Sequence, residues 1–295
     1  MSNEKNMQWI SILGYPRQKS SFLTHKTLYD WLIHQGYNVV TEYNIAKTLN
    51  LKKIHVLKLD EIGQKCDLAI VVGGDGNLLR IARKLSYYSI KIIGVNRGNL
   101  GFLTDLNPNN VIVMLSKILD GEYFLEKRFL LELNIFKKRT GGIKKIIVVN
   151  ECILHPEKIS NMIEFEVYIN KKIAFSQRSD GLIISTPTGS TGYSLSAGGP
   201  ILSTLLDAIL LVPMFPHTLS SRPIVLDGNS IIMLKVFNFE KKIKITCDGQ
   251  TIFSISRGDK IIIRKSKYCL NLIHPKSYSY FQVLNSKLNW SKKLF

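Results

Sequence analysis

Three glycines surround one aspartate in the segment Val71–Asn77, which reads Val-Val-Gly-Gly-Asp-Gly-Asn. Glycine adopts positive φ at no steric cost, and its lack of a Cβ lets backbone N–H groups approach a phosphate closely. A carboxylate in such a turn can take a proton from a hydroxyl or hold a metal bound to phosphate. We interpret Asp75 as a candidate catalytic residue and expect a phosphate loop at Gly73, Gly74, Gly76 and Asn77. The alternative is an ordinary turn at the end of a strand.

A second segment, Ser185–Pro200, is rich in hydroxyl groups and carries no charge. Such a segment can form a neutral hydrogen-bonding cradle for a ribose, a base edge or a phosphate. A flexible Gly/Ser linker is disfavoured, because the segment follows the apolar run Leu182–Ile184 and contains Tyr193 and two prolines. The hydroxyl groups belong to Ser185, Thr186, Thr188, Ser190, Thr191, Tyr193, Ser194 and Ser196.

Two shorter polar groups are weaker candidates. Asn150 and Glu151 follow an apolar run and could together bind the two hydroxyls of a ribose, although as a dipeptide they fit a polar strand end better. Arg178 and Asp180 flank Ser179 before the next apolar run, where an ion pair in a loop explains them equally well.

The sequence contains no metal-binding pattern. The six histidines form no H-x-x-x-H pair, so each fits a surface or capping position better than a ligand position. We therefore expect no metal ligands from protein side chains, and a divalent ion, Mg²⁺, that arrives with nucleotide phosphates. The four cysteines are irregularly spaced and suggest neither disulfides nor zinc. No signal peptide or membrane span is recognisable, which favours a cytoplasmic location.

The first 120 or so residues alternate between strand and helix patterns. Trp9–Leu13, Tyr37–Val40, Leu68–Val72 and Lys91–Val95 are apolar runs typical of buried strands. Between them, Leu28, Trp31 and Leu32 form one helix face before Gly36, and a second face comprises Leu78, Ile81, Ala82 and Leu85. This order predicts a parallel sheet with helices on its faces, where ligands bind beyond the carboxyl ends of the strands.

After residue 125 or so the hydrophobic pattern changes to period two. Ile163–Ile169 and Ile243–Cys247 alternate between apolar and polar residues. Pairs such as Asn170-Lys171 and Asp248-Gly249 are turn signals at hairpin spacing. The second half is therefore predicted to be antiparallel β structure, closed by a short helix that carries Phe281, Leu284 and Leu288.

The charge balance is unusual. With 295 residues and 45% apolar residues the chain can bury a full core, but its 40 basic and 22 acidic residues give a net charge of +18. Such a balance raises the question of a polyanionic partner. Thirty of the forty basic residues are lysines, mostly in scattered pairs such as Lys52-Lys53, which favours a solvated surface over a nucleic-acid groove. We therefore expect no nucleic-acid partner and no membrane partner.

Taken in order, these segments resemble the motif set of the NAD kinases, and the likeness is closest to the bacterial, ATP-using branch. The glycine–aspartate loop alone is shared with related diacylglycerol kinases, sphingosine kinases and phosphofructokinases. The long hydroxyl-rich segment together with Asn-Glu makes the resemblance to the NAD kinases specific. The segments are Gly73–Asn77, Asn96–Asp105, Asn150-Glu151, Arg178–Gly181, Thr186–Pro200, Cys247–Gln250 and Leu272–Pro275.

The resemblance implies a fold of class α/β + β. A Rossmann-like α/β domain would span residues 1–125, an antiparallel β-sandwich domain that binds NAD would span 126–275, and the segment 276–295 would pack back on the first domain. Relatives are homo-oligomers, which implies a dimer or a tetramer here.

The resemblance also implies transfer of the ATP γ-phosphoryl group to the 2′-hydroxyl of the adenosine ribose of NAD, giving NADP and ADP. Asp75 would accept the proton, beside Gly76. Asn150 and Glu151 would hold ribose hydroxyls. Arg178 would contribute to nicotinamide recognition and Gln250 would close the site. Residues implied to bind the base and nicotinamide ends of NAD are Asp180, Thr191, Gly192, Tyr193, Ser194, Leu195 and Ser196.

Two positions depart from the family pattern. Gly192 stands where relatives commonly have Ala, which should loosen the loop slightly. Asn161 stands where close relatives have His, so no binding role is transferred to it. Two other functions stay open: a lipid or sugar kinase that shares the glycine–aspartate loop, and a non-enzymatic nucleic-acid binder suggested by the charge.

Overall fold

A computed structural model gives the structure of residues 7–16, 18–51, 54–97, 101–158, 162–237 and 242–290. Asn161, residues 98–100 of the Asn96–Asp105 motif and residues 291–295 lie outside these ranges. The chain forms two compact units. The first comprises residues 1–127 and 270–295, and the second comprises residues 128–269.

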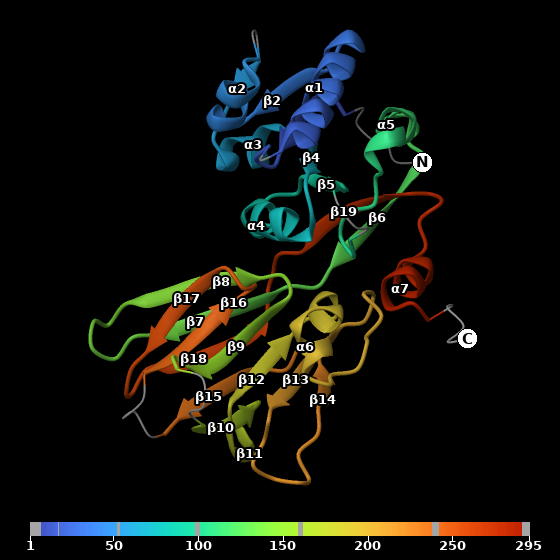
Figure 1. Ribbon diagram of the computed structural model, residues 1–295. Helices are drawn as coiled ribbons and strands as arrows, with labels where there is room; N and C mark the ends of the chain where they lie inside the picture. The colour runs from blue at the N-terminus through green and yellow to red at the C-terminus, as the bar shows by residue number, and fades with distance from the viewer. Residues whose placement is uncertain are drawn as a thin grey trace. The chain divides into compact units, whose positions relative to one another are not determined.

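The first unit contains a seven-stranded sheet in the order β3-β2-β1-β4-β5-β19-β6 (Figure 1). The strand pairs from β3 to β19 are parallel. The strand order reverses between β1 and β4, and ligands bind at such a switch point in open α/β sheets. The strands are β1 (Trp9–Leu13), β2 (Asn38–Thr41), β3 (His55–Val56), β4 (Leu68–Val72), β5 (Lys91–Val95), β6 (Tyr123–Arg128) and β19 (Leu270–Pro275).

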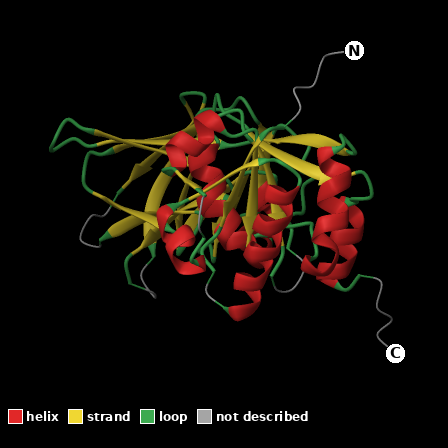
Figure 2. Cartoon of the chain, turned by 90° about the horizontal axis from the view of Figure 1, so that it is seen from above, coloured by secondary structure: helices red, strands yellow, loops and turns green. Residues whose placement is uncertain are grey.

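Helices pack against this sheet. Figure 2 draws all helices of the chain in red and all strands in yellow. Ile70 of β4 packs in one cluster with Leu28 of α1 and Leu115 of α5. The neighbouring Val71 points to the opposite face, because side chains alternate along a strand, and α4 packs against β4 as well. The helices are α1 (Lys19–His34), α2 (Tyr43–Leu49), α3 (Leu59–Lys65), α4 (Asp75–Leu85), η1 (Pro108–Asn110), α5 (Val111–Leu119) and α7 (Tyr280–Leu288).

The second unit contains two six-stranded antiparallel sheets, in the orders β11-β10-β15-β18-β7-β8 and β14-β13-β12-β9-β16-β17. One buried cluster contains Phe165 and Ile263 from the first sheet and Leu154 and Ile184 from the second, so the two sheets pack face to face as a sandwich. This arrangement and the parallel sheet of the first unit confirm the predicted fold class.

Two strands of the second unit keep the positions predicted for them. Ile163–Ile169 and Ile243–Cys247 are strands with the predicted bounds. The bounds are β7 (Leu131–Phe136), β8 (Ile143–Val148), β9 (Glu151–Pro156), β10 (Ile163–Ile169), β11 (Lys172–Ser179), β12 (Gly181–Ser185), η2 (Thr188–Thr191), α6 (Tyr193–Ser196), β13 (Ala208–Met214), β14 (Ile224–Asp227), β15 (Ile232–Val236), β16 (Ile243–Cys247), β17 (Thr251–Ile255) and β18 (Lys260–Lys265).

Two of the predicted turn signals form tight hairpins. Asn170 and Lys171 have φ of 50° and 69° between β10 and β11. Asp248 and Gly249 have φ of 49° and 64° between β16 and β17. Positive φ at both central residues matches the right-handed twist of the flanking strands. The second hairpin places the Asp248 side chain at the end of β16.

The closing helix forms as predicted, but its buried face differs from the predicted one. Phe281 is 70% exposed, whereas Val283 and Leu284 are buried. The Ser279 hydroxyl accepts a hydrogen bond from the backbone N–H of Gln282 and so caps the helix. Among the residues that the structure describes, no helix is long and apolar enough to cross a membrane.

Candidate functional site

Asp75 is the first residue of α4 and follows the carboxyl end of β4. Gly74 is the N-cap of this helix, and Gly73 has φ of +149°, a conformation that residues with side chains rarely adopt. The positive end of a helix dipole favours both a carboxylate and a phosphate at this position. At least two of the four expected phosphate-loop N–H groups are used within the protein, because Gly73 donates to Val95 O and Asn77 donates to Gly74 O.

The segment that follows β5 holds the Asp75 carboxylate. The N–H of Phe102 donates to Oδ2 at 2.8 Å, while the N–H of Leu103 and the hydroxyl of Thr104 each donate to Oδ1 at 3.2 Å. A Cβ at Gly101 would overlap Asp75 Oδ1, so this position has no room for a side chain. Oδ2 accepts one of these three bonds, which leaves it a lone pair for a substrate hydroxyl. Sequence reasoning did not assign these donors, although it singled out their motif.

In the second unit, the side chain of Asp248 holds the backbone at Asn150 and Glu151. Its Oδ1 accepts hydrogen bonds from the N–H groups of Asn150 at 2.8 Å and Glu151 at 3.3 Å, and both of its oxygens lie 3.1 Å from the N–H of Val149. Three consecutive backbone donors therefore converge on one buried carboxylate. Two sequence features could have identified Asp248: it begins an Asp-Gly turn, and it lies in the motif Cys247–Gln250. No role was assigned to it from the sequence.

Asn150 and Glu151 present buried polar atoms without partners. Asn150 Oδ1 and Glu151 Oε2 have no hydrogen-bond partner among the described residues. Burial raises the pKa of Glu151 to about 7, the Asp248 charge adds to the shift, and a backbone hydrogen bond at Tyr193 opposes it. Gly192 lies against this pair, since a Cβ there would be 3.2 Å from Glu151 Oε2. Unpaired buried polar atoms are costly, so a ligand that pairs them is favoured.

The hydroxyl-rich segment is ordered rather than a linker, and it forms η2 and α6. Four of its hydroxyl groups are buried and bond to backbone atoms of the protein. Thr186 donates to Val149 O at 2.7 Å and Ser194 donates to Gly189 O at 2.7 Å. Ser185 and Ser190 are likewise engaged within the protein. Tyr193 and Ser196 are exposed, and Thr191 and Leu195 are half-buried.

The remaining predicted residues lie at strand ends of the second unit. Arg178 lies on β11 opposite Glu164 of β10, and their side chains form an exposed ion pair at 3.8 Å. The alternative of an ion pair is thus confirmed for Arg178, but the pair lies on two strands rather than in a loop. Asp180 lies between β11 and β12, where its N–H donates to Met214 O. Gln250 closes the β16–β17 turn through a bond from its N–H to Cys247 O.

Two histidines differ from the surface or capping positions expected for them. His25 is fully buried, with its ring nitrogens 2.8 Å from Ser21 O and 2.6 Å from Gly14 O, and burial lowers its pKa. His274 is also buried. Among the described residues, no group of three His, Cys, Asp or Glu side chains could hold a metal ion.

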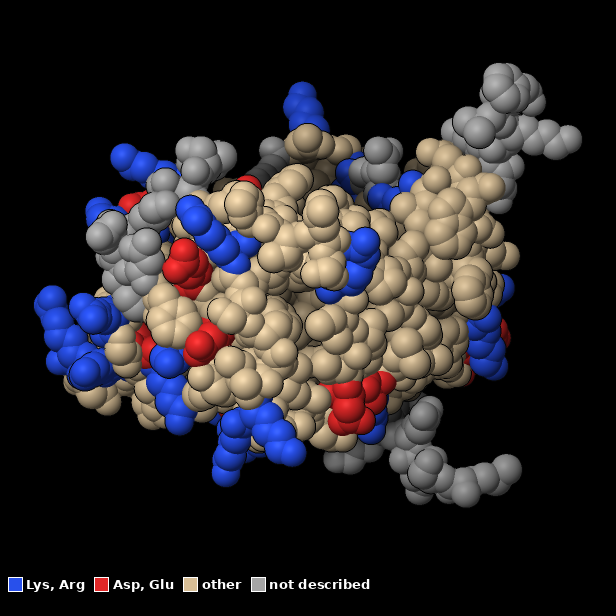
Figure 3. All heavy atoms as spheres, turned by 90° about the horizontal axis from the view of Figure 1, so that it is seen from below, with Lys and Arg blue, Asp and Glu red and all other residues tan. Residues whose placement is uncertain are grey.

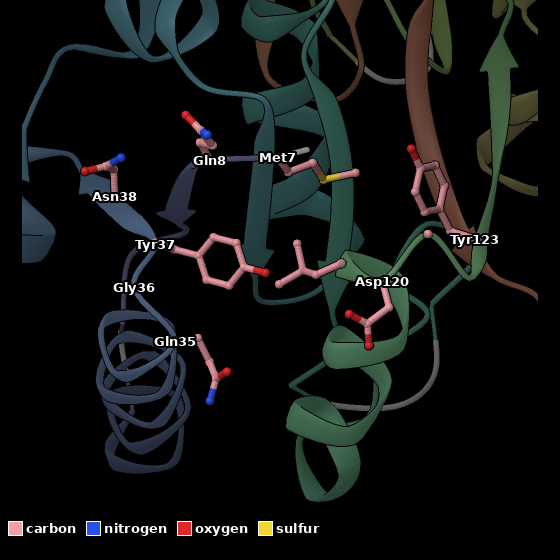
Figure 4. Close-up of a pocket in the computed structure, with 10 residues that line it drawn as sticks. Met7, Gln8, Gln35, Gly36, Tyr37, Asn38, Asp120 and Tyr123 are labelled. Carbon is pink, nitrogen blue, oxygen red and sulfur yellow. The ribbon is translucent and has the colours of Figure 1, made fainter. Parts of the chain in front are cut away.

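A cavity of about 790 Å³ lies at the amino-terminal edge of the first unit's sheet, opposite the edge that carries Asp75. Figure 4 shows Tyr37, which directly precedes β2, extending toward the end of α5 near Asp120. None of the predicted site residues lines this cavity. It therefore belongs to a separate part of the first unit.

Lysines and arginines are dispersed on the face drawn in Figure 3, where they stand singly or in small groups between uncharged areas. Acidic side chains lie among some of them. This distribution fits the solvated surface inferred from the lysine pairs.

Comparison with known proteins gives matches along most of the chain. Residues 10–123 match the ATP-NAD kinase N-terminal domain, and residues 149–275 match the ATP-NAD kinase C-terminal domain. The chain is 60% identical to the NAD kinase of Buchnera aphidicola subsp. Schizaphis graminum over 97% of this chain and 98% of that protein. It is 56% identical to the NAD kinase of Yersinia pestis over 99% of this chain and 100% of that protein.

Solved structures share the fold. The crystal structure of yeast NADH kinase complexed with NADH superposes with a TM-score of 0.91 at 22% identity, covering 99% of this chain and 90% of that one. An NAD kinase from Archaeoglobus fulgidus in complex with ATP gives 0.74 at 24% identity, covering 96% and 99%. With the two domain matches and the full-length relatives, these findings show that the chain belongs to the ATP-NAD kinase family.

Proposed function

We propose that this chain transfers the γ-phosphoryl group of ATP to the 2′-hydroxyl of the adenosine ribose of NAD, giving NADP and ADP. Relatives named NAD kinase at 55–60% identity over nearly the full length support this activity. The observation that carries the chemistry is the Asp75 carboxylate, held at the start of α4 by three donors with acceptor capacity left on Oδ2.

Asp75 orients the attacking hydroxyl and accepts its proton. A ribose hydroxyl is a weak nucleophile at neutral pH, and a positioned carboxylate contributes roughly 10²–10⁴-fold by taking the proton as the new P–O bond forms. The bond between the γ-phosphorus and the bridging oxygen of ATP breaks, and ADP leaves. The donors from residues 102–104 fix the direction of the carboxylate, which keeps its oxygen aligned with the hydroxyl.

NAD binding is assigned to residues of the second unit. Asn150 and Glu151 hold ribose hydroxyls, because their buried atoms Oδ1 and Oε2 lack partners among the described residues. Glu151 acts as a hydrogen-bond donor in its protonated form, which its raised pKa makes available near pH 7. The base and nicotinamide ends are assigned to Asp180 and the Thr191–Ser196 stretch, with Arg178 at the nicotinamide and Gln250 closing the site.

Magnesium is assigned to the ATP phosphates. Asp75 is a single carboxylate that already accepts three hydrogen bonds, so it offers few oxygen ligands to a metal ion. An ion carried by the nucleotide phosphates fits this position better than a metal site built from protein side chains. When bound, the ion neutralises charge on the transferring phosphoryl group. A cytoplasmic location and a homo-oligomeric assembly, a dimer or a tetramer, stay predictions.

The experiment is a product assay on the purified protein. Incubation with Mg-ATP and NAD should generate a product that an NADP-specific dehydrogenase reduces. The same preparation is offered a diacylglycerol and a hexose phosphate in place of NAD. Phosphorylation of either, with no NADP formed, would show that the glycine–aspartate loop serves a lipid or sugar kinase instead. Retention of a polynucleotide without ATP consumption would favour the nucleic-acid binder.

A further inference from the structure

His274 lies near the end of β19 in the first unit and is 1% exposed. Its ring stacks with two aromatic rings, at centroid distances of 5.1 Å from Phe124 and 4.1 Å from Tyr278. The motif Leu272–Pro275 drew attention to this position in the sequence, but the proposed activity assigns it no role.

Both ring nitrogens of His274 face carboxylates. Nδ1 lies 2.5 Å from Asp105 Oδ2, and Nε2 lies 2.9 Å from Glu126 Oε2. Both acidic side chains are less than 8% exposed. A neutral imidazole can donate from one nitrogen only, so donation to both carboxylates would require a ring protonated at both nitrogens. The titratable side chains that contact the ring include Asp105, Glu126 and Tyr278.

Asp105 directly follows the three residues that hold Asp75. Its N–H and that of Leu106 donate to Gly94 O at 3.2 and 3.0 Å, which ties the segment to β5. Thr104 is fully buried and packs closely against Gly94 of β5, where a Cβ would overlap it. The Asp105 side chain ties the same segment to β19 through His274. The segment that donates to Asp75 is therefore anchored twice. Its backbone bonds to β5, and the side chain of Asp105 bonds to His274.

We propose that His274 is a positioning residue for Asp75, acting through Asp105 and the donors at residues 102–104. The proposal rests on the proposed function, since it concerns the proton acceptor of that reaction. Without the two ring nitrogens, the buried carboxylates of Asp105 and Glu126 would lose their common partner, and the Asp105 side chain would shift from its present position. A displacement of about 1 Å in a reacting group can lower a rate by about 10²-fold.

A double-mutant cycle tests this proposal. His274→Phe keeps an aromatic ring beside Phe124 and Tyr278 but removes both N–H donors. We expect it to lower kcat at least tenfold, with KM for ATP and NAD changed less than about threefold. In an Asp75→Ala background, measured in single turnovers with radiolabelled ATP, the same substitution should change the rate less than about threefold. His34→Phe, on the exposed end of α1, is the matched control and should leave kcat unchanged.

The outcomes separate positioning from a structural role. A loss of about threefold or more in the Asp75→Ala background too, or a loss below tenfold in the wild-type background, would overturn the proposal. If His274→Phe does not fold, by circular dichroism, Asp105→Asn is measured in the same two backgrounds against the same limits. Absence of NADP formation by the wild-type protein would instead overturn the proposed function.

Discussion

The chemistry of Glu151 depends strongly on its surroundings. Its carboxyl is buried beside a second carboxylate, Asp248, and its pKa rises to about 7. A folded-state pKa above the unfolded value means that the folded protein binds the proton more tightly. The contribution to stability is therefore largest below the unfolded pKa of about 4.5 and falls as pH rises toward 7.

This shift predicts a pH-dependent effect of Glu151→Gln. The amide cannot ionise, so the variant should gain stability relative to the wild type as pH rises from 4.5 to 8, by up to about 3 kcal/mol. Urea unfolding of both proteins at pH 5 and pH 8 measures the difference. Glu164→Gln, at an exposed position, is the control. A stability difference that is equal at the two pH values would argue against a buried, protonatable Glu151.

At the scale of elements, the sequence predicted strands and helices well because their patterns are local. The run Leu68–Val72 is β4 with the predicted bounds, and all five residues are buried. Contacts between distant segments could not be predicted in this way. Asp248 meets Val149 across 99 residues, and His274 meets Asp105 across 169. Hydrophobic periodicity identifies an element but not its partners, so β19 could not be placed between β5 and β6 from its pattern.

The Asp248 anchor makes a prediction at this scale. Asp248→Ala leaves the N–H groups of Val149, Asn150 and Glu151 without their acceptor, which should lower the free energy of unfolding by about 1–3 kcal/mol. It should also raise KM for NAD more than KM for ATP. Steady-state kinetics and urea unfolding measure the two effects. Asp227→Ala is the matched control, since this turn aspartate accepts the N–H of Asn229 at the surface. Equal changes in both KM values would contradict the assigned role.

At the scale of the whole molecule, the net charge of +18 has only a small role in the proposed function. The residues assigned to chemistry are mainly glycines, hydroxyl residues, amides and carboxylates, and the lysines are dispersed on the face shown in Figure 3. The polyanions of the proposed reaction are ATP and a dinucleotide, so the excess charge acts as a weak steering field.

Steering by dispersed charge predicts a small salt effect. Added salt screens attraction between the basic surface and anionic substrates, so KM for ATP should rise less than about threefold between roughly 50 and 300 mM salt, with kcat constant. Initial rates across this range give both constants. A fall in substrate affinity of several orders of magnitude would instead indicate an extended phosphate-binding surface.

The central claim is that Asp75 accepts the proton of the 2′-hydroxyl. Asp75→Asn removes the proton acceptor and keeps the size of the side chain, and Asp30→Asn on the exposed face of α1 is the matched control. The decisive measurement is kcat for NADP formation by folded Asp75→Asn. A fall of about 10²–10⁴-fold, with Asp30→Asn unchanged, is the predicted result. Turnover close to that of the wild type would contradict the account.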